Sequence, residues 1–367
     1  MRRRRAAFGS GRVAYAGPMT AASPPRVAPS SGAWRGIVIP LAILAILFVV
    51  ILPRIVDYGA VIDALRRLTA GQLLALGAAA ALAYVASAVP YKLLVKPLTW
   101  PHAVGADIAG RAVASTIPGP TDIATRIVLY TQWGVSLETA SAGLVIGGLV
   151  ETGSALVLPL LALVTIVATG TPVSPLIVWL AAIGAIVLVV AVTAFMAIVR
   201  SERIARSIGE LLERLAARVF AMLNRHPPEA IVQAILDLRS RLHDLANRRG
   251  IAAYVAAVGA KLAWFLVLEV ALTAFGMGPS VLAPGAVLTA MAVVAIVSLM
   301  PLTPGGAGVS ELTYLAVLTA LVDPSLAASV AAAVLLFRIV QWLVPIPLGW
   351  VLLVVMRRGH GLFTDEA

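Results

Sequence analysis

The sequence predicts an all-α integral membrane protein: a polytopic helical bundle with two inverted-topology halves, each containing a Pro/Gly-broken re-entrant helix pair. The first observation behind this prediction is composition. Of the 367 residues, 60% are hydrophobic and 12% are charged, and the mean hydropathy is +0.98, whereas roughly 25% of residues are charged in soluble domains. The second observation is a hydrophobic segment that is interrupted by Pro and Gly and that occurs once in each half of the chain.

The two interruptions resemble each other in sequence and in setting. A helix-forming run follows each of them, and their residues are Pro118, Gly119 and Pro120 in the first and Pro304, Gly305, Gly306 and Gly308 in the second. Broken apolar segments at corresponding positions of two halves are typical of transport sites built from half-helices. Each arm is too short to cross a bilayer with certainty, so re-entrant pairs are predicted in preference to full spans.

The charge balance indicates how the chain is oriented. The formal net charge of +11 would indicate nucleic-acid binding in a soluble protein. Here the basic residues cluster beside apolar segments, so a positive-inside signal explains them better and no nucleic-acid partner is expected. The chain has no cysteine, which excludes disulfides and thiolate metal sites. Its four His residues lack metal-ligand spacing, and neither a metal nor another cofactor is expected.

Residues 1–35 are predicted to form a disordered, basic cytoplasmic tail. They mix Arg with Pro, Ser and Gly, and they lack the apolar run of a signal peptide. Such a segment buries too little apolar surface to fold by itself. The alternative interpretation is that Met19 is the true start.

The first membrane half is predicted over residues 36–199. At about 20 apolar residues per crossing, hydropathy predicts single spans at 37–52, 73–95, 139–168 and 175–199. The first broken unit lies between the second and third of these spans, over 103–133.

Residues 200–250 form the one strongly charged internal stretch. Their apolar residues recur at the three-four spacing of amphipathic helices, with a Pro-containing turn between two runs. A cytoplasmic amphipathic helical hairpin is therefore predicted. It is interpreted as a solvated connector between the halves, with docking of a partner as the alternative.

The second membrane half, residues 251–358, repeats the plan of the first. Single spans are predicted at 251–275 and 326–356, around a second broken unit at 283–321, and residues 359–367 form a cytoplasmic tail. With the Arg-rich amino terminus inside, the crossing count puts both termini in the cytoplasm. The two broken units then enter from opposite faces, which is an inverted repeat.

Charged residues lie within the apolar stretches of both halves. An unpaired charge at the centre of a membrane costs about 2.5–3.5 kcal/mol on insertion scales, so these residues should pair or face a wet cavity. Glu151 and Arg338 fall at similar depths in the two halves, and a salt bridge between them is predicted, either structural or functional. The full set is Asp107, Arg111, Asp122, Arg126, Glu151, Lys261, Glu269, Glu311 and Arg338.

The two Pro/Gly interruptions could also bind an anion. A half-helix that begins inside the bilayer leaves N–H groups unpaired at the positive end of its dipole, which suits an anion such as a lipid phosphate. Gly305, Gly306 and Gly308 would let the backbone approach such a ligand closely. The alternative is a Gly-rich break that serves only to pack helices tightly.

From residue 37 to residue 358 the chain resembles the flippase-like transmembrane domain of the lysylphosphatidylglycerol synthase family, in particular its stand-alone, actinobacterial-type members. The family's second motif, Pro-Gly-Gly-x-Gly-x-x-Glu, matches from Pro304 to Glu311 in full. Its first motif, Pro-Gly followed by a basic residue, matches Pro118, Gly119 and Arg126, but Asp122 stands one position away from the acid that the family commonly has. The soluble aminoacyl-transfer domain is absent, so the resemblance implies lipid translocation and not lipid synthesis.

These observations predict translocation of an anionic lipid or lipid-linked amphiphile across the cytoplasmic membrane. In this hypothesis Arg126 and Arg338 attract the phosphate, the 304–308 turn supplies N–H donors, and Glu151 and Glu311 hold or release the arginines. The alternative is a non-transporting membrane partner of a cell-envelope lipid or glycan biosynthesis enzyme. Enzymatic activity is not expected, because no nucleophile-base set is visible. A cavity lined by Arg126 and Glu311 would favour translocation, and a filled interior would favour the partner.

Overall fold

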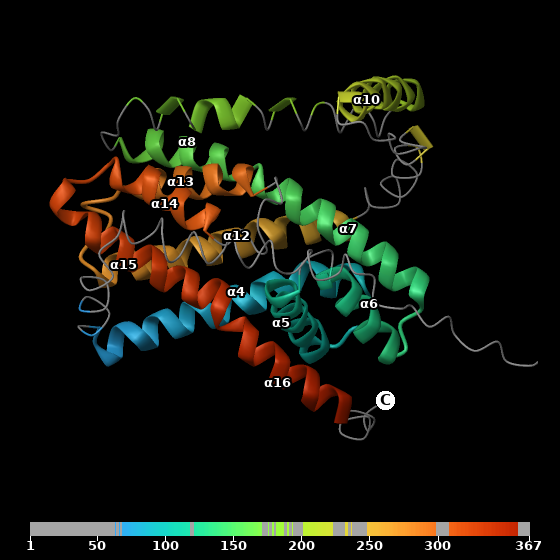
Figure 1. Cartoon of the computed structure of the whole chain (residues 1–367), viewed down its shortest axis with the longest axis horizontal. Helices are drawn as coiled ribbons and strands as arrows, with labels where there is room; N and C mark the ends of the chain where they lie inside the picture. The colour runs from blue at the N-terminus through green and yellow to red at the C-terminus, as the bar shows by residue number, and fades with distance from the viewer. Residues whose placement is uncertain are drawn as a thin grey trace, which may run out of the picture.

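The computed structural model describes residues 68–117, 121–170, 201–222, 248–298 and 308–358, together with isolated positions between these ranges. All regular structure in the described part of the chain is helical. Figure 1 shows the arrangement of the helices, which are α4 (Ala70–Leu94), α5 (Trp100–Thr116), α6 (Thr121–Gln132), α7 (Leu137–Ala155), α8 (Leu158–Thr169), α10 (Glu202–Met222), α12 (Arg248–Ala274), α13 (Pro284–Val297), α14 (Val309–Thr319), η3 (Pro324–Leu326), α15 (Ala327–Arg338), η4 (Ile339–Leu343) and α16 (Pro345–Arg358).

Four helical stretches of the described chain are long and apolar enough to cross a membrane: Ala70–Leu94, Leu137–Thr169, Arg249–Ala274 and Pro324–Met356. They confirm the predicted spans at 73–95, 139–168, 251–275 and 326–356 to within a few residues. The predicted all-α, polytopic membrane class is therefore confirmed. The predicted span at 37–52 and the tails at 1–35 and 359–367 lie outside the described residues, and the predicted span at 175–199 is described only over 181–186 and at a few further positions, all of them helical.

Both broken units form pairs of short helices that contact each other. The first pair is α5 with α6, and the second is α13 with α14. The two pairs lie toward opposite sides of Figure 1, α5 and α6 on the right and α13 and α14 on the left. The breaks themselves, residues 118–120 and 299–307, are not described. Re-entrance and the inverted relation between the halves remain predictions.

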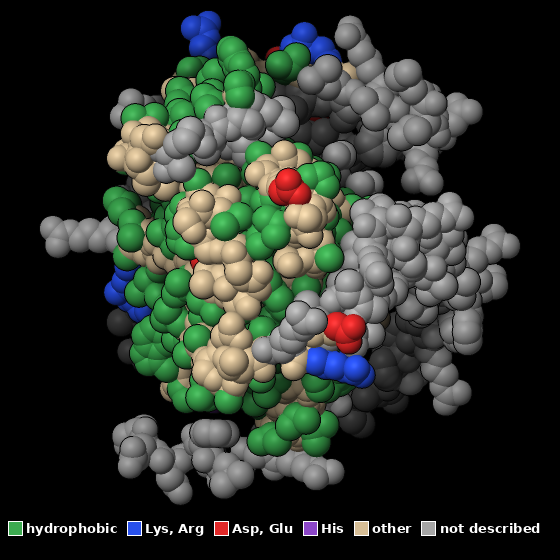
Figure 2. Space-filling model, turned by 90° about the vertical axis from the view of Figure 1, so that its left-hand side faces the viewer, with side chains coloured by type: hydrophobic (Ala, Val, Ile, Leu, Met, Phe, Trp, Pro, Cys, Tyr) green, Lys and Arg blue, Asp and Glu red, His purple; other side chains and the backbone are tan. Residues whose placement is uncertain are grey.

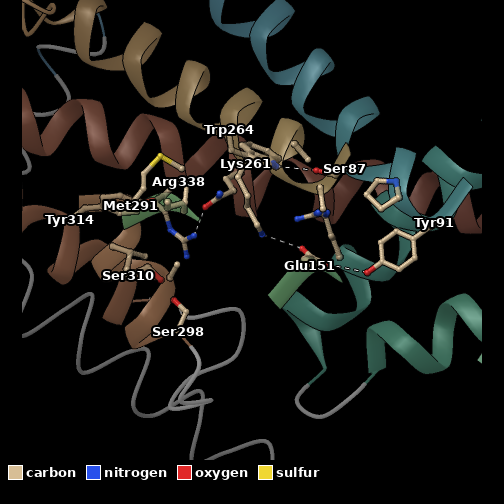
Figure 3. A pocket seen from close by; sticks show the side chains of 18 residues that line it. Ser87, Tyr91, Glu151, Lys261, Trp264, Met291, Ser298, Ser310, Tyr314 and Arg338 are labelled. Atoms are coloured by element: carbon tan, nitrogen blue, oxygen red, sulfur yellow. Dashed lines mark hydrogen bonds and ion pairs between the residues drawn. The ribbon is translucent and has the colours of Figure 1, made fainter. Parts of the chain in front are cut away.

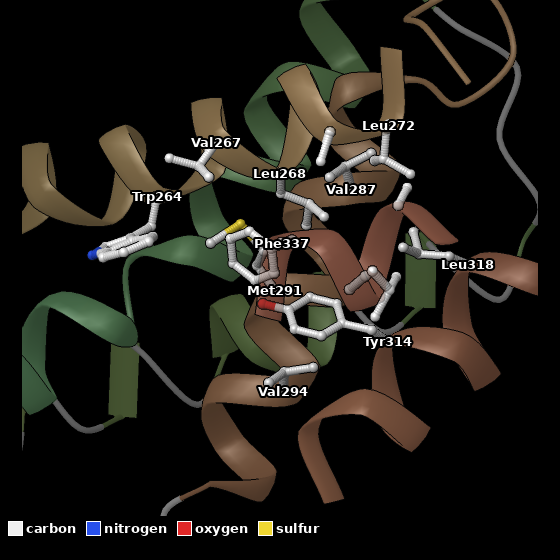
Figure 4. Packing of buried hydrophobic residues seen from close by; sticks show 14 of the residues in the cluster. Trp264, Val267, Leu268, Leu272, Val287, Met291, Val294, Tyr314, Leu318 and Phe337 are labelled. Atoms are coloured by element: carbon white, nitrogen blue, oxygen red, sulfur yellow. The ribbon is translucent and has the colours of Figure 1, made fainter. Parts of the chain in front are cut away.

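The core joins helices from both halves. Its most extensive contact is that of α4 with α12, where small residues such as Ala83 and Ala271 are fully buried and let the helix backbones approach closely. Aromatic rings continue this packing in edge-to-face pairs. The ring centroids are 5.1 Å apart for Tyr84 with Trp264, and 6.2 Å apart for Trp264 with Phe337 (Figure 4). The two halves therefore share one apolar core.

The outer surface of the spans is also apolar. Many large hydrophobic side chains are exposed, which is expected where the surrounding medium is hydrocarbon and not water. In the end view of Figure 2, apolar side chains cover most of the described surface and charged ones are few. Examples from several helices are Leu74, Val85, Val167, Val255, Val351 and Val354.

Helix α10 differs from the spans in having charged residues of both signs along an exposed face. Its pairs Glu202–Arg206 and Glu210–Arg214 are exposed to solvent. At Gly209, an added Cβ would lie 3.0 Å from the Cα of Val232, so the chain beyond α10 folds back against it. This helix covers the first arm of the predicted hairpin, and most of the second arm lies outside the described residues, so the hairpin stays a prediction.

Close packing of α16 on α5 makes a first prediction. A Cβ added at Gly349 would lie 2.7 Å from the backbone oxygen of Ile108 and 2.4 Å from the Cβ of Ala112. The backbone contact cannot be relieved by a rotamer change, so Gly349→Ala should lower the free energy of unfolding by about 1–3 kcal/mol, as overpacking commonly does.

The matched control is Gly259→Ala in α12, where an added Cβ has no atom within 4 Å. Because Ala has the higher helix propensity, this control should be neutral or stabilise by up to about 1 kcal/mol. The measurement is the unfolding midpoint of the purified variants in detergent. Equal midpoints for the two variants would contradict the tight α5–α16 contact.

Candidate functional site

A cavity of about 220 Å³ lies between the two halves of the bundle (Figure 3). The first half contributes residues from α4, α5, α7 and the start of α8, and the second half contributes residues from α12 to η4. The polar and aromatic members of the lining are Ser87, Tyr91, Arg111, Glu151, Lys261, Trp264, Ser298, Ser310, Tyr314, Arg338 and Gln341. This cavity thus brings polar side chains from both halves together within the described part of the bundle.

Glu151 connects the two halves across this cavity. Its Oε1 lies 3.6 Å from Nζ of Lys261 on α12, and its Oε2 accepts a 3.0 Å hydrogen bond from the hydroxyl of Tyr91 on α4. The Glu151 side chain is nevertheless 44% exposed and that of Lys261 24% exposed. This pair is therefore the most accessible of the intramembrane ion pairs among the described residues.

Arg338 is bound to Glu311 on the second half's own broken unit. Its Nε donates to Oε1 of Glu311 at 2.7 Å, and its Nη1 donates to Oε1 of Gln341 at 2.6 Å. The other oxygen of Glu311 accepts the backbone N–H of Gly308. Gly308 has a φ of 83°, a conformation that favours glycine. Glu311 thus ties the residue that precedes α14 to the end of α15.

The turn that follows Arg338 is π-helical. Residues Ile339–Leu343 form η4, in which Val344 N–H bonds to the carbonyl of Ile339. A π-turn shifts the register of the side chains that follow it, and such turns are frequent at functional sites. Here it interrupts a long apolar span beside the cavity, where Gln341 contributes to the lining.

The first broken unit contains a second charge cluster, centred on Asp107. This carboxylate is fully buried, with Oδ2 2.8 Å from Nε of Arg111 and Oδ1 3.0 Å from Nη2 of Arg126. Arg126 also lies 3.4 Å from Asp122, and its guanidinium is 4.4 Å from the centroid of the Tyr91 ring. Arg126 is 3% exposed and Arg111 25% exposed. Arg111 therefore faces the cavity, and Arg126 lies behind it.

The predicted salt bridge between Glu151 and Arg338 is wrong. Both residues line the same cavity, but Glu151 pairs with Lys261 and Arg338 pairs with Glu311. The physical reason is helix packing: α7 packs on α12, and α14 packs on α15. Each charge therefore meets a nearer partner than its counterpart in the other half.

The predicted site residues have different positions relative to the cavity. Glu151 and Arg338 line it, Gly308 and Glu311 lie directly behind Arg338, and Asp122 and Arg126 lie behind Arg111. The remaining ones, Pro118, Gly119, Pro304, Gly305 and Gly306, lie outside the described residues.

The lining also contains residues that were not chosen as site residues from the sequence. The main ones are Arg111 and Lys261. The sequence could have indicated both, because each is a cation within an apolar run. Arg111 also follows Asp107 by one helical turn, and the pair forms an i,i+4 bridge. Ser87 accepts a 3.1 Å hydrogen bond from Nε1 of Trp264, and no sequence pattern indicates that contact.

The ion-pair geometry makes a second prediction. Removing one member of a buried pair strands the other and typically costs about 3–5 kcal/mol. Glu311→Gln and Arg338→Gln should each destabilise the protein by that order. The double variant should cost clearly less than the sum of the two single variants, because neither charge is then stranded.

The control cycle combines Glu151→Gln with Arg338→Gln, two residues of the same cavity that have different partners. Their effects should be coupled much less strongly than those of Glu311 and Arg338, because they form no ion pair with each other. Both double-mutant cycles are measured from the unfolding midpoints of the purified variants in detergent. Additivity between Glu311 and Arg338, or strong coupling between Glu151 and Arg338, would contradict the observed pairing.

Comparison with known proteins identifies the family of this chain. A comparison with curated proteins gave no match. A family model described as the lysylphosphatidylglycerol synthase TM region matches residues 37–349, which include every described helix that contributes to the cavity. This match covers most of the chain and confirms the resemblance carried by the two Pro-Gly motifs. The chain therefore belongs to the family of the lysylphosphatidylglycerol synthase transmembrane region.

Proposed function

We propose that this protein translocates an anionic lipid, or a lipid-linked amphiphile, across the cytoplasmic membrane. The observation that carries the proposal is the polar cavity between the two halves, whose lining includes three cations, Arg111, Lys261 and Arg338, and one carboxylate, Glu151. The family supports a lipid-related role in a membrane. Cations in the lining can donate charge-assisted hydrogen bonds to a headgroup that carries a phosphate.

The depth of the cavity fits a translocation site. At 1.5 Å per residue, Glu151, Lys261 and Arg338 each lie roughly 20 Å along their helical spans, near the middle of a hydrocarbon core about 30 Å thick. Intramembrane charges at this depth are expensive and typically mark a substrate or ion pathway. A headgroup that crosses the bilayer must pass this plane, where the cavity offers charges and hydroxyl groups in place of water.

The described residues on either side of the second break line the cavity. Ser298, just after α13, and Ser310, in the first turn of α14, both line the chamber. The amino-terminal turn of a half-helix presents N–H groups and a positive dipole end to an anion. Glu311 occupies the N–H of Gly308, so we propose that this carboxylate holds the turn in shape while a phosphate binds beside it.

The cations have separate roles in this proposal. Lys261 exchanges its accessible partner Glu151 for the phosphate, and Arg111 adds a second donor from the first half. Arg126 acts through Asp107: it holds the carboxylate that orients Arg111. This differs from the sequence hypothesis, in which Arg126 itself attracted the phosphate.

The test is movement of a labelled anionic lipid, phosphatidylglycerol, in liposomes that contain the purified protein. A charge-assisted hydrogen bond contributes about 1.5–3 kcal/mol, so Lys261→Gln and Arg111→Gln should each slow transfer by about tenfold or more. Gly306→Val should also slow it, by placing a side chain at the second break. The matched control is Arg206→Gln, which removes an exposed cation of α10 away from the cavity.

Transfer by Lys261→Gln and Arg111→Gln at the wild-type rate would overturn the assignment of the cavity as the pathway. Wild-type protein that moves no anionic lipid under any gradient would favour the alternative, a membrane partner of a cell-envelope biosynthesis enzyme. Copurification of such an enzyme with the wild-type protein would then be the next measurement.

We also propose that both termini and α10 are cytoplasmic, so that the turn before α15 is external. Because the chain has no cysteine, single cysteines report topology without background. Ser207→Cys on α10 and Ser325→Cys in η3 are conservative changes at exposed positions. In intact cells a membrane-impermeant maleimide should label Ser325→Cys and should label Ser207→Cys only after permeabilisation. Equal labelling of both in intact cells would contradict the orientation.

A further inference from the structure

A second cavity lies at the end of the bundle where α4 begins and α12 ends. Its volume is about 480 Å³. Its walls are mostly apolar and come from the first turns of α4, the last turns of α12 and the segment that leads into α13: Ala75, Phe265, Leu266, Val270, Pro279 and Pro284. Ala75 and Leu266 are exposed on the outer surface of the bundle, so the cavity opens toward the surrounding hydrocarbon.

One carboxylate, Glu269, lines this cavity. Its side chain is 9% exposed, and its Oε1 is buried without a hydrogen-bond partner among the described residues. It also takes part in none of the ion pairs between described residues, unlike the other carboxylates within the spans, Asp107, Glu151 and Glu311. An acid within the membrane requires a hydrogen-bond donor or a cation, and no described side chain provides one to Oε1 of Glu269.

The amide group of Gln72, another polar residue of the lining, is already engaged. Nε2 of Gln72 donates to the carbonyl of Ala274 at 3.1 Å, and its Oε1 accepts from the backbone N–H of Thr69 at 2.8 Å. These bonds close the capping box of α4 and tie it to the end of α12. Gln72 thus shapes the cavity, and its amide hydrogen bonds are directed elsewhere than to Glu269.

The depth of Glu269 indicates which ligands can reach it. It lies about 7.5 Å from the end of α12 at 1.5 Å per residue. For a helix about 40 Å long that is centred in a hydrocarbon core of about 30 Å, this position is close to the boundary between acyl chains and headgroups. A ligand with an apolar body in the cavity and a charged group at this boundary would satisfy both the walls and the carboxylate.

We infer that this cavity binds an amphiphile with a primary ammonium group, whose ammonium pairs with Glu269 and whose apolar chain lies along Phe265 and Leu266. A buried carboxylate is stabilised by a cation that also donates hydrogen bonds. An ammonium provides both, and the apolar walls select for an attached alkyl chain. The site is separate from the polar cavity between the halves, and this inference does not rest on lipid transport.

The test uses a dodecylamine analogue that carries a photoactivatable diazirine in its alkyl chain, with the corresponding alcohol as the neutral probe. Irradiation with wild-type protein in nanodiscs should label the segment from Phe265 to Pro284. Glu269→Gln has nearly the same shape, and it should reduce labelling by the amine about tenfold or more, as loss of a charge-assisted hydrogen bond implies. Labelling by the alcohol should be weak and the same in both proteins.

Two further variants separate a specific loss from a folding defect. Glu138→Gln removes an exposed carboxylate at the start of α7 and should label like wild type. Ala75→Phe fills the mouth of the cavity without changing charge and should reduce labelling by both probes. Equal labelling of wild type and Glu269→Gln by the amine, with both proteins folded as judged by their unfolding midpoints, would overturn the inference.

Competition identifies the source of the ammonium. Phosphatidylethanolamine in the nanodisc should reduce labelling by the amine, whereas phosphatidylglycerol at the same content should not. Ethanolamine in solution offers the same ammonium without an apolar chain and should compete only at much higher concentration. Equal competition by phosphatidylglycerol would show that the chain alone is recognised and would overturn the role of Glu269.

Discussion

The requirement that charges within a hydrocarbon layer have partners determines most of this structure. Among the described residues, four cations of the spans and broken units, Arg111, Arg126, Lys261 and Arg338, are balanced by Asp107, Asp122, Glu151 and Glu311. One of these pairs joins helices that are far apart in sequence, because Glu151 connects α7 to α12. Arg338 instead joins α15 to the preceding α14. Breaking a buried pair such as Arg338–Glu311 would strand a buried charge, so the buried pairs also determine which helix faces can meet. The cavity lies where three of these pairs converge.

Close backbone contacts provide the second constraint on the fold. Gly349 allows α16 to approach α5, Gly285 allows α13 to approach α8, and Gly147 accommodates the ring of Tyr91. In a membrane, where lipid is as apolar as the helices, such close contacts supply much of the packing energy. The Tyr91 example links packing to chemistry, because the same ring lies over Arg126 and its hydroxyl bonds to Glu151. A glycine on α7 thus positions a residue that contacts both charge clusters.

The spans could be predicted from the sequence because hydropathy and length are local properties. The span predicted at 73–95 is helix α4 at Ala70–Leu94, and the two broken units appear as paired short helices. The need for intramembrane charges to pair was also predictable, and it holds for all the predicted residues except Glu269. The choice of partner was not: equal depth suggested Glu151 with Arg338, but depth does not say which helices are neighbours. For the same reason Arg111, and not Arg126, proved to face the cavity, because the exposure of each depends on how α5 and α6 pack.

The balance of charge in the cavity is consistent with a carrier more than with a tight receptor. A carrier must release its headgroup on the far side, so a site that binds an anion with several unpaired cations would hold it too firmly. Here each cation of the lining has a carboxylate or amide partner in the described structure. The net binding energy of a phosphate is therefore only the difference between its interaction with the cation and the interaction of the partner that it replaces. Lys261 and Glu151 offer the smallest barrier to such an exchange, because both side chains are partly exposed and their charged atoms are 3.6 Å apart, whereas Arg338 and Glu311 are buried at 2.7 Å. Under the proposed function, the loose pair is the one that would exchange with a headgroup, and the tight pair is the one that would hold α14 against α15.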